Sequence, residues 1–178
     1  MNQIQRISKR FRIIFIIAFW LIPLFTVAFW LSGGFPGIPT VDAFLPANYV
    51  PLVQVMPLWA RLVGCLLSFI PTAAVMIVTY LLIHLFTLYE QNKIFTEDNV
   101  RTIRNIGYTV LIGEIISLIY HPIITVFVSA TSGLTHALAE IKFDIADATT
   151  FIVAFIIILI AWIMRAGQQL QEESDYTV

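Results

Sequence analysis

The sequence has few charged residues and a single cysteine. Only 12% of its 178 residues are charged, against 59% hydrophobic, so little of the chain can form a soluble domain. The net charge of −1 provides no basic field of the kind that direct nucleic-acid binding needs. Because Cys65 has no second thiol to pair with, a dithiol redox centre and a cysteine-rich metal site are disfavoured.

Catalytic motifs are also missing from the sequence. It contains no glycine-rich phosphate loop, no serine or cysteine nucleophile beside an evident base, and no recognisable pair of catalytic carboxylates. We therefore predict that the protein is not an enzyme and needs no cofactor.

What the sequence does contain is four long apolar runs, at Phe11–Leu31, Leu62–Leu88, Ile103–Val128 and Ala148–Met164. About 20 apolar residues cross the hydrocarbon core of a bilayer as a helix. The runs predict an all-α integral membrane protein, a single domain over residues 1–178 with four transmembrane helices in a bundle. Including the flanking turns, the predicted spans are about 11–31, 60–88, 97–129 and 148–170.

The basic residues divide unevenly between the two sides of the membrane. Eight of the ten lie before or at the start of the first run, between the second run and the start of the third, or after the fourth, and the other two are Arg61 and Lys142. The positive-inside rule then places both termini in the cytoplasm. Residues 32–58 and 129–147 become outer loops.

The two outer loops differ in character. The first is rich in proline and glycine yet apolar, so it either covers an outward cavity as a lid or touches lipid headgroups. The second has apolar residues at helical spacing from Leu134 to Ile145, which predicts an amphipathic helix over about 134–147, either on the outer surface or as an extension of the fourth span. Its polar face of His136, Glu140 and Asp144 matches no tight metal motif, and we predict a solvated face and no metal.

Glu114 is the main candidate for a functional residue. It lies about ten residues into the third span, near the bilayer midplane, where a carboxyl group faces the bundle interior, pairs or stays protonated. It is either a ligand or proton site or a structural carboxyl group bonded to a neighbouring span, with Thr72 and Thr79 as candidate partners. Tyr120 and His121 follow on the same span and would extend a polar path outward, so these five residues form the predicted ligand-binding set.

Small residues recur at every fourth position of the second span, at Ala60, Gly64, Ser68 and Thr72. Small residues at this spacing let membrane helices approach closely. We interpret the stripe as a helix-packing face that could also support a homo-oligomer.

Two stretches of the sequence resemble an uncharacterised family of bacterial four-span inner-membrane proteins. The first comprises Leu85–Glu90, Ile94–Thr96, Asn99–Val100 and Ile103–Gly107, and the second comprises Gly167, Leu170–Glu173 and Asp175–Val178. The resemblance implies a location in the bacterial cytoplasmic membrane. It also implies a cytoplasmic helix-turn-helix regulator of the XRE type as a partner, because genes of the family often lie beside one.

Charges on the side predicted to be cytoplasmic suggest where such a partner would bind. We hypothesise that the C-terminal helix docks on the 89–104 segment through ion pairs between these charges. This contact would open easily, because exposed ion pairs are weak. The predicted partner-binding residues are Glu90, Lys93, Arg101, Arg104, Glu172 and Glu173.

Two functions remain after these exclusions. The first is a binding or regulatory membrane protein that senses an apolar or amphipathic ligand and signals to the cytoplasmic regulator. The alternative is a small oligomeric transporter or channel that uses Glu114.

Overall fold

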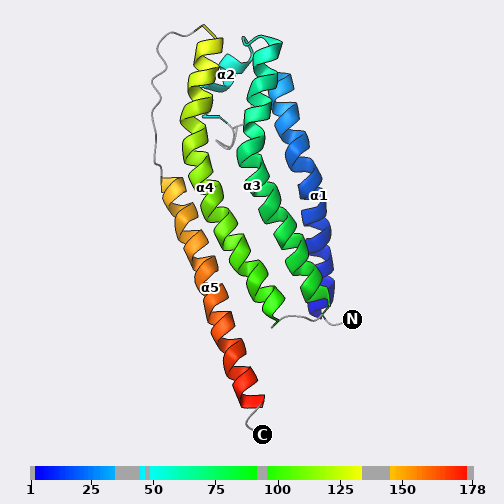
Figure 1. Ribbon diagram of the computed structural model, residues 1–178. Coiled ribbons are helices and arrows are strands. Elements are labelled where there is room, and N and C mark those ends of the chain that lie inside the picture. The colour runs from blue at the N-terminus through cyan, green and yellow to red at the C-terminus, as the bar shows by residue number, and fades with distance from the viewer. Residues whose placement is uncertain (1–2, 35–44, 47–48, 92–95, 134–144, 176–178) are drawn as a thin grey trace. The chain divides into compact units, whose positions relative to one another are not determined.

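In the computed structural model, every regular element of the described residues is a helix (Figure 1). The described residues are 3–34, 45–46, 49–91, 96–133 and 145–175. The four long helices are α1 (Gln3–Ser32), α3 (Leu58–Glu90), α4 (Glu97–Thr131) and α5 (Ile145–Asp175), and α2 (Val50–Val53) is a single turn. All four long helices have the length and apolar composition to cross a membrane. The chain is therefore an all-helical, multi-pass membrane protein with four candidate spans.

The helices extend beyond the predicted spans. Helix α1 begins at Gln3 instead of residue 11, and α5 covers 145–175 instead of 148–170. The reason is that hydropathy marks the part of a helix inside lipid, whereas the polar residues beyond it are also good helix formers.

Thr96 followed by Glu97 and Asp98 predicts a helix start near Thr96, with the Thr96 hydroxyl as its cap, and α4 begins at the next residue, Glu97. The Thr96 carbonyl accepts hydrogen bonds from the backbone N–H groups of Asn99 and Val100, at 3.0 and 3.2 Å. Its hydroxyl, which we expected to cap the helix, is buried without a hydrogen-bond partner in the described part of the chain. Backbone bonds therefore close this turn, with Glu97 and Asp98 adding negative charge where the helix dipole favours it.

Three long helices contain an internal proline, at Pro23, Pro71 and Pro122, and all three continue through it. Proline removes one backbone donor from a helix, and nearby Ser or Thr hydroxyls help to make such sites tolerable in membranes. The Thr72 hydroxyl donates to the Ser68 carbonyl at 2.7 Å, and the Thr125 hydroxyl donates to the His121 carbonyl at 3.0 Å.

The chain forms two compact units, and α1, α3 and α4 each contribute residues to both. Unit 1 comprises residues 1–19, 74–114 and 145–178, and unit 2 comprises residues 20–73 and 115–144. Each unit has its own packing and its own polar contacts.

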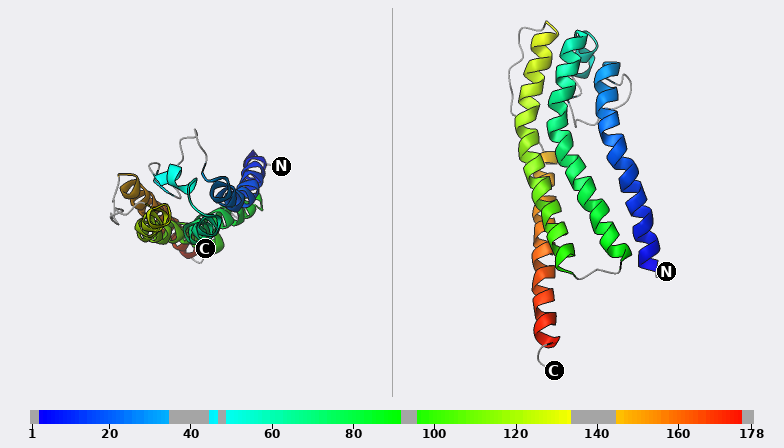
Figure 2. Two further views of the ribbon diagram at one scale, coloured as in Figure 1. Left: turned by 90° about the horizontal axis from the view of Figure 1, so that it is seen from above. Right: turned by 45° about the vertical axis from the view of Figure 1, so that its right-hand side comes forward.

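In unit 1, α1 packs against α3, α3 against α4, and α4 against α5, so the helices lie in their order along the chain (Figure 2). On α1, Phe11 and Phe15 stack on Phe86 of α3, with ring centroids 5.3 and 5.6 Å apart. Helices α3 and α4 lie close together at Gly113 of α4, where an added Cβ atom would be 3.0 Å from the Ala74 side chain of α3. Helix α4 contacts α5 at another glycine, Gly107. Single aromatic and small residues thus set the distance between neighbouring helices. This is expected in a membrane, where the hydrophobic effect does not drive helices together.

Unit 2 has the more continuous core. The α1 residues Phe29 and Trp30 pack with residues from α3, from α4 and from the connection that follows α1. Trp30, Ile124 and Val128 are fully buried. Helix α1 ends at a glycine pair, where the Gly34 N–H donates to the Phe29 carbonyl at 2.8 Å and both Gly33 and Gly34 have positive φ, the conformation that glycine adopts most easily.

The described part of the predicted first outer loop belongs to this core. Leu45, Val50, Val53 and Met56 are all buried and join the same cluster as Trp30. Arg61 holds the segment in place, because its guanidinium group donates to the carbonyls of Met56 and Gln54, at 3.2 and 2.7 Å. These residues therefore fill space between helices. The predicted amphipathic helix of the second loop lies outside the described residues, except for its last three, which begin α5.

Candidate functional site

The candidate site is a pair of carboxyl groups that joins α4 to α5 within unit 1. Glu114 is the middle residue of α4, and its side chain forms a hydrogen bond with that of Asp147, the third residue of α5. Both side chains are half-buried. A hydrogen bond between two carboxyl groups needs one proton as its donor, so the contact depends on what occupies the space between the oxygens.

The rise per residue of a helix gives the distance of the carboxyl pair from the charged helix ends. The start of α4, which contains Arg101, and the later part of α5, which contains Arg165, lie toward the end of unit 1 that also carries the N-terminus (Figure 1), and we call it the basic end. At 1.5 Å per residue, Glu114 lies about 20 Å from Arg101, and Asp147 about 27 Å from Arg165. These distances locate the pair along the two helices, and the position of Glu114 near the bilayer midplane stays a prediction.

A glycine brings the two helices together. A Cβ atom on Gly107 of α4 would lie 2.6 Å from the Ile158 side chain and 3.3 Å from the Ala154 carbonyl oxygen of α5. Because no side chain stands there, the backbones can approach closely. The Gly107–Ile158 contact and the Glu114–Asp147 pair also show that the two helices are antiparallel.

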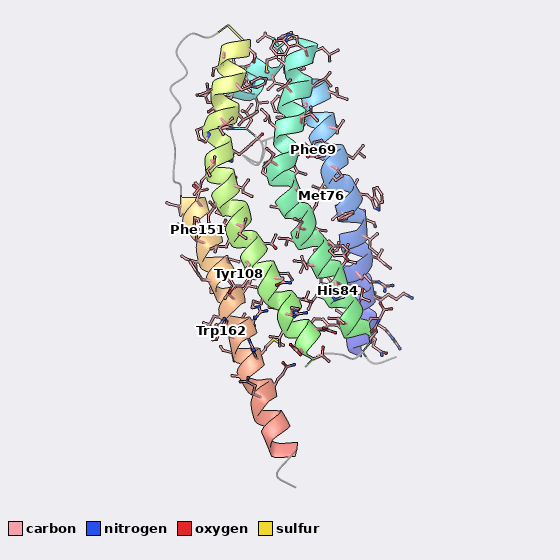
Figure 3. All side chains as sticks on the ribbon, in the orientation of Figure 1. Phe69, Met76, His84, Tyr108, Phe151 and Trp162 are labelled. Atoms are coloured by element: carbon pink, nitrogen blue, oxygen red, sulfur yellow. The ribbon has the colours of Figure 1, made fainter. Side chains whose placement is uncertain are left out.

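Helix α5 is held along one narrow stripe. Of the apolar stretch of α5 that could cross the membrane, 11% is buried inside the protein. This is the smallest share among the four candidate spans, and the largest is 22%, in α3. Ala154 and Ala161 are buried against the rest of unit 1, whereas Trp162 is 66% exposed (Figure 3). Of the four spans, α5 is therefore the one that packing inside the chain restrains least.

The structure places two of the predicted ligand-binding residues in a different polar network, in unit 2. The Trp30 indole N–H donates to the Ser68 hydroxyl at 2.8 Å, and that hydroxyl lies 2.6 Å from the Tyr120 hydroxyl. Thr72 joins the network through its bond to the Ser68 carbonyl and lies 3.4 Å from the Thr26 hydroxyl. Thr72 and Tyr120 thus connect α1, α3 and α4 in a buried, structural arrangement.

The other two predicted ligand-binding residues have local contacts. The Thr79 hydroxyl donates to the Val75 carbonyl of its own helix at 2.8 Å, so Asp147 takes the place that we assigned to a threonine beside Glu114. The half-buried His121 ring lies edge-on to the Tyr120 ring, with centroids 5.7 Å apart.

The small-residue stripe of α3 is occupied within the chain. A Cβ atom on Gly64 would lie 2.3 Å from the Trp30 ring, which also binds Ser68. This face therefore packs α1 against α3, and it is not free to form the oligomer contact that we considered for it.

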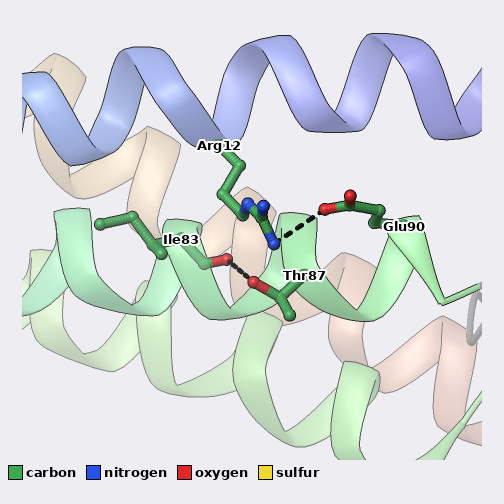
Figure 4. Close-up of polar contacts among 4 residues, drawn as sticks. All are labelled: Arg12, Ile83, Thr87 and Glu90. Carbon is green, nitrogen blue, oxygen red and sulfur yellow. Dashed lines mark hydrogen bonds and ion pairs between the residues drawn. The ribbon is translucent and has the colours of Figure 1, made fainter.

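Glu90 forms an ion pair that its sequence neighbours did not indicate. Its carboxylate lies 2.8 Å from the guanidinium group of Arg12 on α1, and the two side chains are 27% and 31% exposed (Figure 4). One turn earlier, the Thr87 hydroxyl donates to the Ile83 carbonyl. Glu90 thus takes part in an α1–α3 ion pair, and its role in binding a partner stays a prediction.

The remaining predicted partner-binding residues lie near the basic end. Arg101 is exposed and Arg104 half-buried on α4, and Lys93 lies outside the described residues. Glu172 and Glu173 belong to the helical backbone of α5, but their side chains lie outside the described part. From the Gly107–Ile158 contact, Arg101 lies level with about residue 164, so Glu172 lies about 12 Å further along the helix axis. The docking of the C-terminal helix on the 89–104 segment stays a prediction, because residues 92–95 and the side chains of Glu172 and Glu173 lie outside the described part.

Among the described residues, no three His, Cys, Asp or Glu side chains gather as metal ligands. His136, Glu140 and Asp144 lie outside that part of the chain. Sequence reasoning missed Asp147 as the partner of Glu114. The available signal was that Asp147 is the acidic residue directly before the fourth apolar run.

Comparison with curated proteins and with solved structures finds no match. The family described as "Protein of unknown function (DUF2975)" matches residues 45–178, which include α2 to α5 and the carboxyl pair. The chain therefore belongs to the DUF2975 family.

Proposed function

We propose that the protein is a regulatory membrane protein in which the Glu114–Asp147 pair senses an amphipathic ligand and α5 carries the signal to a cytoplasmic partner. The single observation that carries this proposal is the juxtaposition of two carboxyl groups, Glu114 and Asp147, on adjacent membrane helices. Intramembrane carboxyl groups are costly and are functional candidates by default.

The chemistry of the pair makes it responsive. Two ionised carboxylates about 4 Å apart repel each other by on the order of 4 kcal/mol at an effective dielectric constant of about 20. A bound proton or an ammonium group removes that repulsion. Because α5 is the least buried span, a change in this contact would move it more readily than any other helix.

The ligand that fits this site best is a cationic amphiphile. Its ammonium group would donate to both carboxylates, and its apolar tail would lie among the exposed apolar side chains that α4 and α5 contribute to unit 1, such as Ile112 and Ile152. An uncharged amphiphile of the same length would lack the donors.

The proposal places the protein in the bacterial inner membrane with both termini in the cytoplasm, which the distribution of basic residues supports. Helix α5 is continuous from Ile145 to Asp175, so a displacement at Asp147 reaches the far end of the same rigid element. The partner there would be the helix-turn-helix regulator implied by the family resemblance.

Distance measurements between spin labels on α4 and α5 would test the sensing step. Labels replace the exposed Tyr108 and Trp162, and the protein is reconstituted in nanodiscs with dodecylamine or dodecanol. We expect dodecylamine to shift the distance distribution and dodecanol to leave it unchanged. Glu114→Gln should abolish the shift, and Glu97→Gln, which removes an exposed carboxylate from the same helix, should preserve it. A shift that survives Glu114→Gln would refute the role of the pair.

The partner is tested separately by co-purification. The full-length protein in detergent should retain a helix-turn-helix regulator from its own host, and dodecylamine should change the amount retained. Failure to retain any such regulator would remove the signalling step while leaving the distance result standing.

The alternative function, an oligomeric transporter or channel, is favoured by the same pair and by the largely unburied spans, which leave surface for further copies. Proton flux into liposomes that is abolished by Glu114→Gln would support it over the regulatory role. Liposomes that stay sealed would count against it.

A further inference from the structure

Helix α1 has two different faces in unit 1. Arg12 and Phe15 point toward α3, through the ion pair with Glu90 and the stacking on Phe86, and Ser8 is buried. The opposite face is exposed and begins with three cations, Arg6, Lys9 and Arg10. Their spacing of i, i+3 and i+4 brings the three side chains together within one helical turn.

Helices α1 and α3 offer no further acidic residue to balance the charge of these three residues. The sequence of α1 contains no Asp or Glu, and the only acidic residue in α3 is Glu90. Glu90 is already engaged with Arg12 at 2.8 Å. The three cations therefore form a positive patch that an anion from outside the α1–α3 pair would complement.

The patch continues directly into an apolar surface. Ile13 and Ile17 are 46% and 53% exposed, and their positions at i+7 and i+11 from Arg6 place them on the same face. Cations followed along one face by exposed aliphatic side chains match a molecule with an anionic head and an apolar tail.

We propose that this face of α1, which we call the basic face (Arg6, Lys9, Arg10, Ile13 and Ile17), binds an anionic phospholipid. The phosphate lies among the three cations, and an acyl chain lies along the two isoleucines. Charge complementarity favours an anionic lipid over a zwitterionic one, because the cationic headgroup of a zwitterionic lipid would be repelled by the three basic side chains. The basic face lies outside residues 45–178, which the family shares.

Lipid titration followed by native mass spectrometry tests this assignment. Full-length protein in a neutral detergent at low salt is titrated with phosphatidylglycerol or phosphatidylcholine. Each cation near a lipid surface contributes about a fivefold change in affinity, so Arg6→Gln/Lys9→Gln/Arg10→Gln should lose on the order of a hundredfold preference for phosphatidylglycerol. Arg6→Lys/Arg10→Lys, which retains all three charges, should keep it.

A second variant controls for structural damage in the same part of α1. Arg12→Gln/Glu90→Gln removes the ion pair at unchanged net charge and leaves the basic face intact. We expect this variant to lower the melting temperature and to keep the preference for phosphatidylglycerol. Neutralising the basic face should instead leave the melting temperature unchanged and remove the lipid preference.

Three results would overturn the proposal. They are an unchanged phosphatidylglycerol preference in the neutralised variant, an equal loss in Arg12→Gln/Glu90→Gln, and displacement of the lipid by glycerol phosphate at equal concentration. The last would identify a site for free phosphate compounds instead of a lipid.

Discussion

Replacement of Gly64 by alanine should destabilise the protein, although alanine is the better helix former. The added Cβ atom would lie 2.3, 2.4 and 2.8 Å from three carbons of the Trp30 ring, closer than van der Waals contact allows. The ring cannot simply move away, because it is fully buried and its N–H is bonded to Ser68 at 2.8 Å.

The expected size follows from three contributions. Overpacking a core costs about 1–3 kcal/mol, and a weakened indole hydrogen bond costs about 1 kcal/mol more. The gain in helix propensity from glycine to alanine offsets about 1 kcal/mol. A net loss of about 2 kcal/mol lowers the melting temperature by about 4–8 °C for a chain of this size.

Gly167 provides the matched control. It is also a helical glycine, but a Cβ atom there would meet nothing within 4 Å. Gly167→Ala should therefore keep or raise the melting temperature. Thermal unfolding of both variants in the same detergent, followed by circular dichroism, makes the comparison.

A double-mutant cycle assigns the effect to the ring. In a Trp30→Leu background, Gly64→Ala should cost much less, because the clashing atoms are gone. If Gly64→Ala is as stable as Gly167→Ala, or if its cost is the same without Trp30, the reasoning about this contact is wrong.

Three further predictions concern other contacts. Arg12→Gln and Glu90→Gln should each destabilise the protein by about 1 kcal/mol or less, since the ion pair is about one-third exposed; chemical denaturation should show that the double variant costs less than the sum. Ser68→Ala should cost about 1–3 kcal/mol because it leaves the buried Trp30 indole N–H without its acceptor, and a melting temperature within 1 °C or so of wild type would contradict this. Arg61→Gln should remove the guanidinium bonds to the Gln54 and Met56 carbonyls and so increase proteolytic cleavage within 45–57, and an unchanged digestion pattern would show that apolar burial alone holds the segment.

The number of spans and the helical class could be predicted from the sequence because each depends on local composition. A run of about 20 apolar residues has few alternatives to a membrane helix. The start of α4 beside Thr96 followed from local signals as well, but the bond from the Thr96 hydroxyl did not form. A capping preference is statistical, and backbone bonds can close the same turn.

Contacts between helices could not be predicted, because they depend on register and rotation that no single helix encodes. Glu114 was recognised as costly in lipid, but its partner Asp147 lies 33 positions later and becomes its neighbour only through the antiparallel register of α4 and α5. Glu90 was assigned to nearby cations in the sequence, whereas the structure pairs it with distant Arg12. The stripe around Gly64 was recognised as a packing face, and only the structure identifies Trp30 as its occupant.

The ion pair between Arg12 and Glu90 has a consequence for biosynthesis. Glu90 emerges from the ribosome about 80 residues after Arg12, which at 5–20 residues per second is a delay of roughly 4 to 16 s. During that interval the first span is already made while its anionic counterpart does not yet exist. The N-terminal hairpin can therefore reach its final alignment only after the second span has been completed, which gives the nascent chain a defined order of assembly.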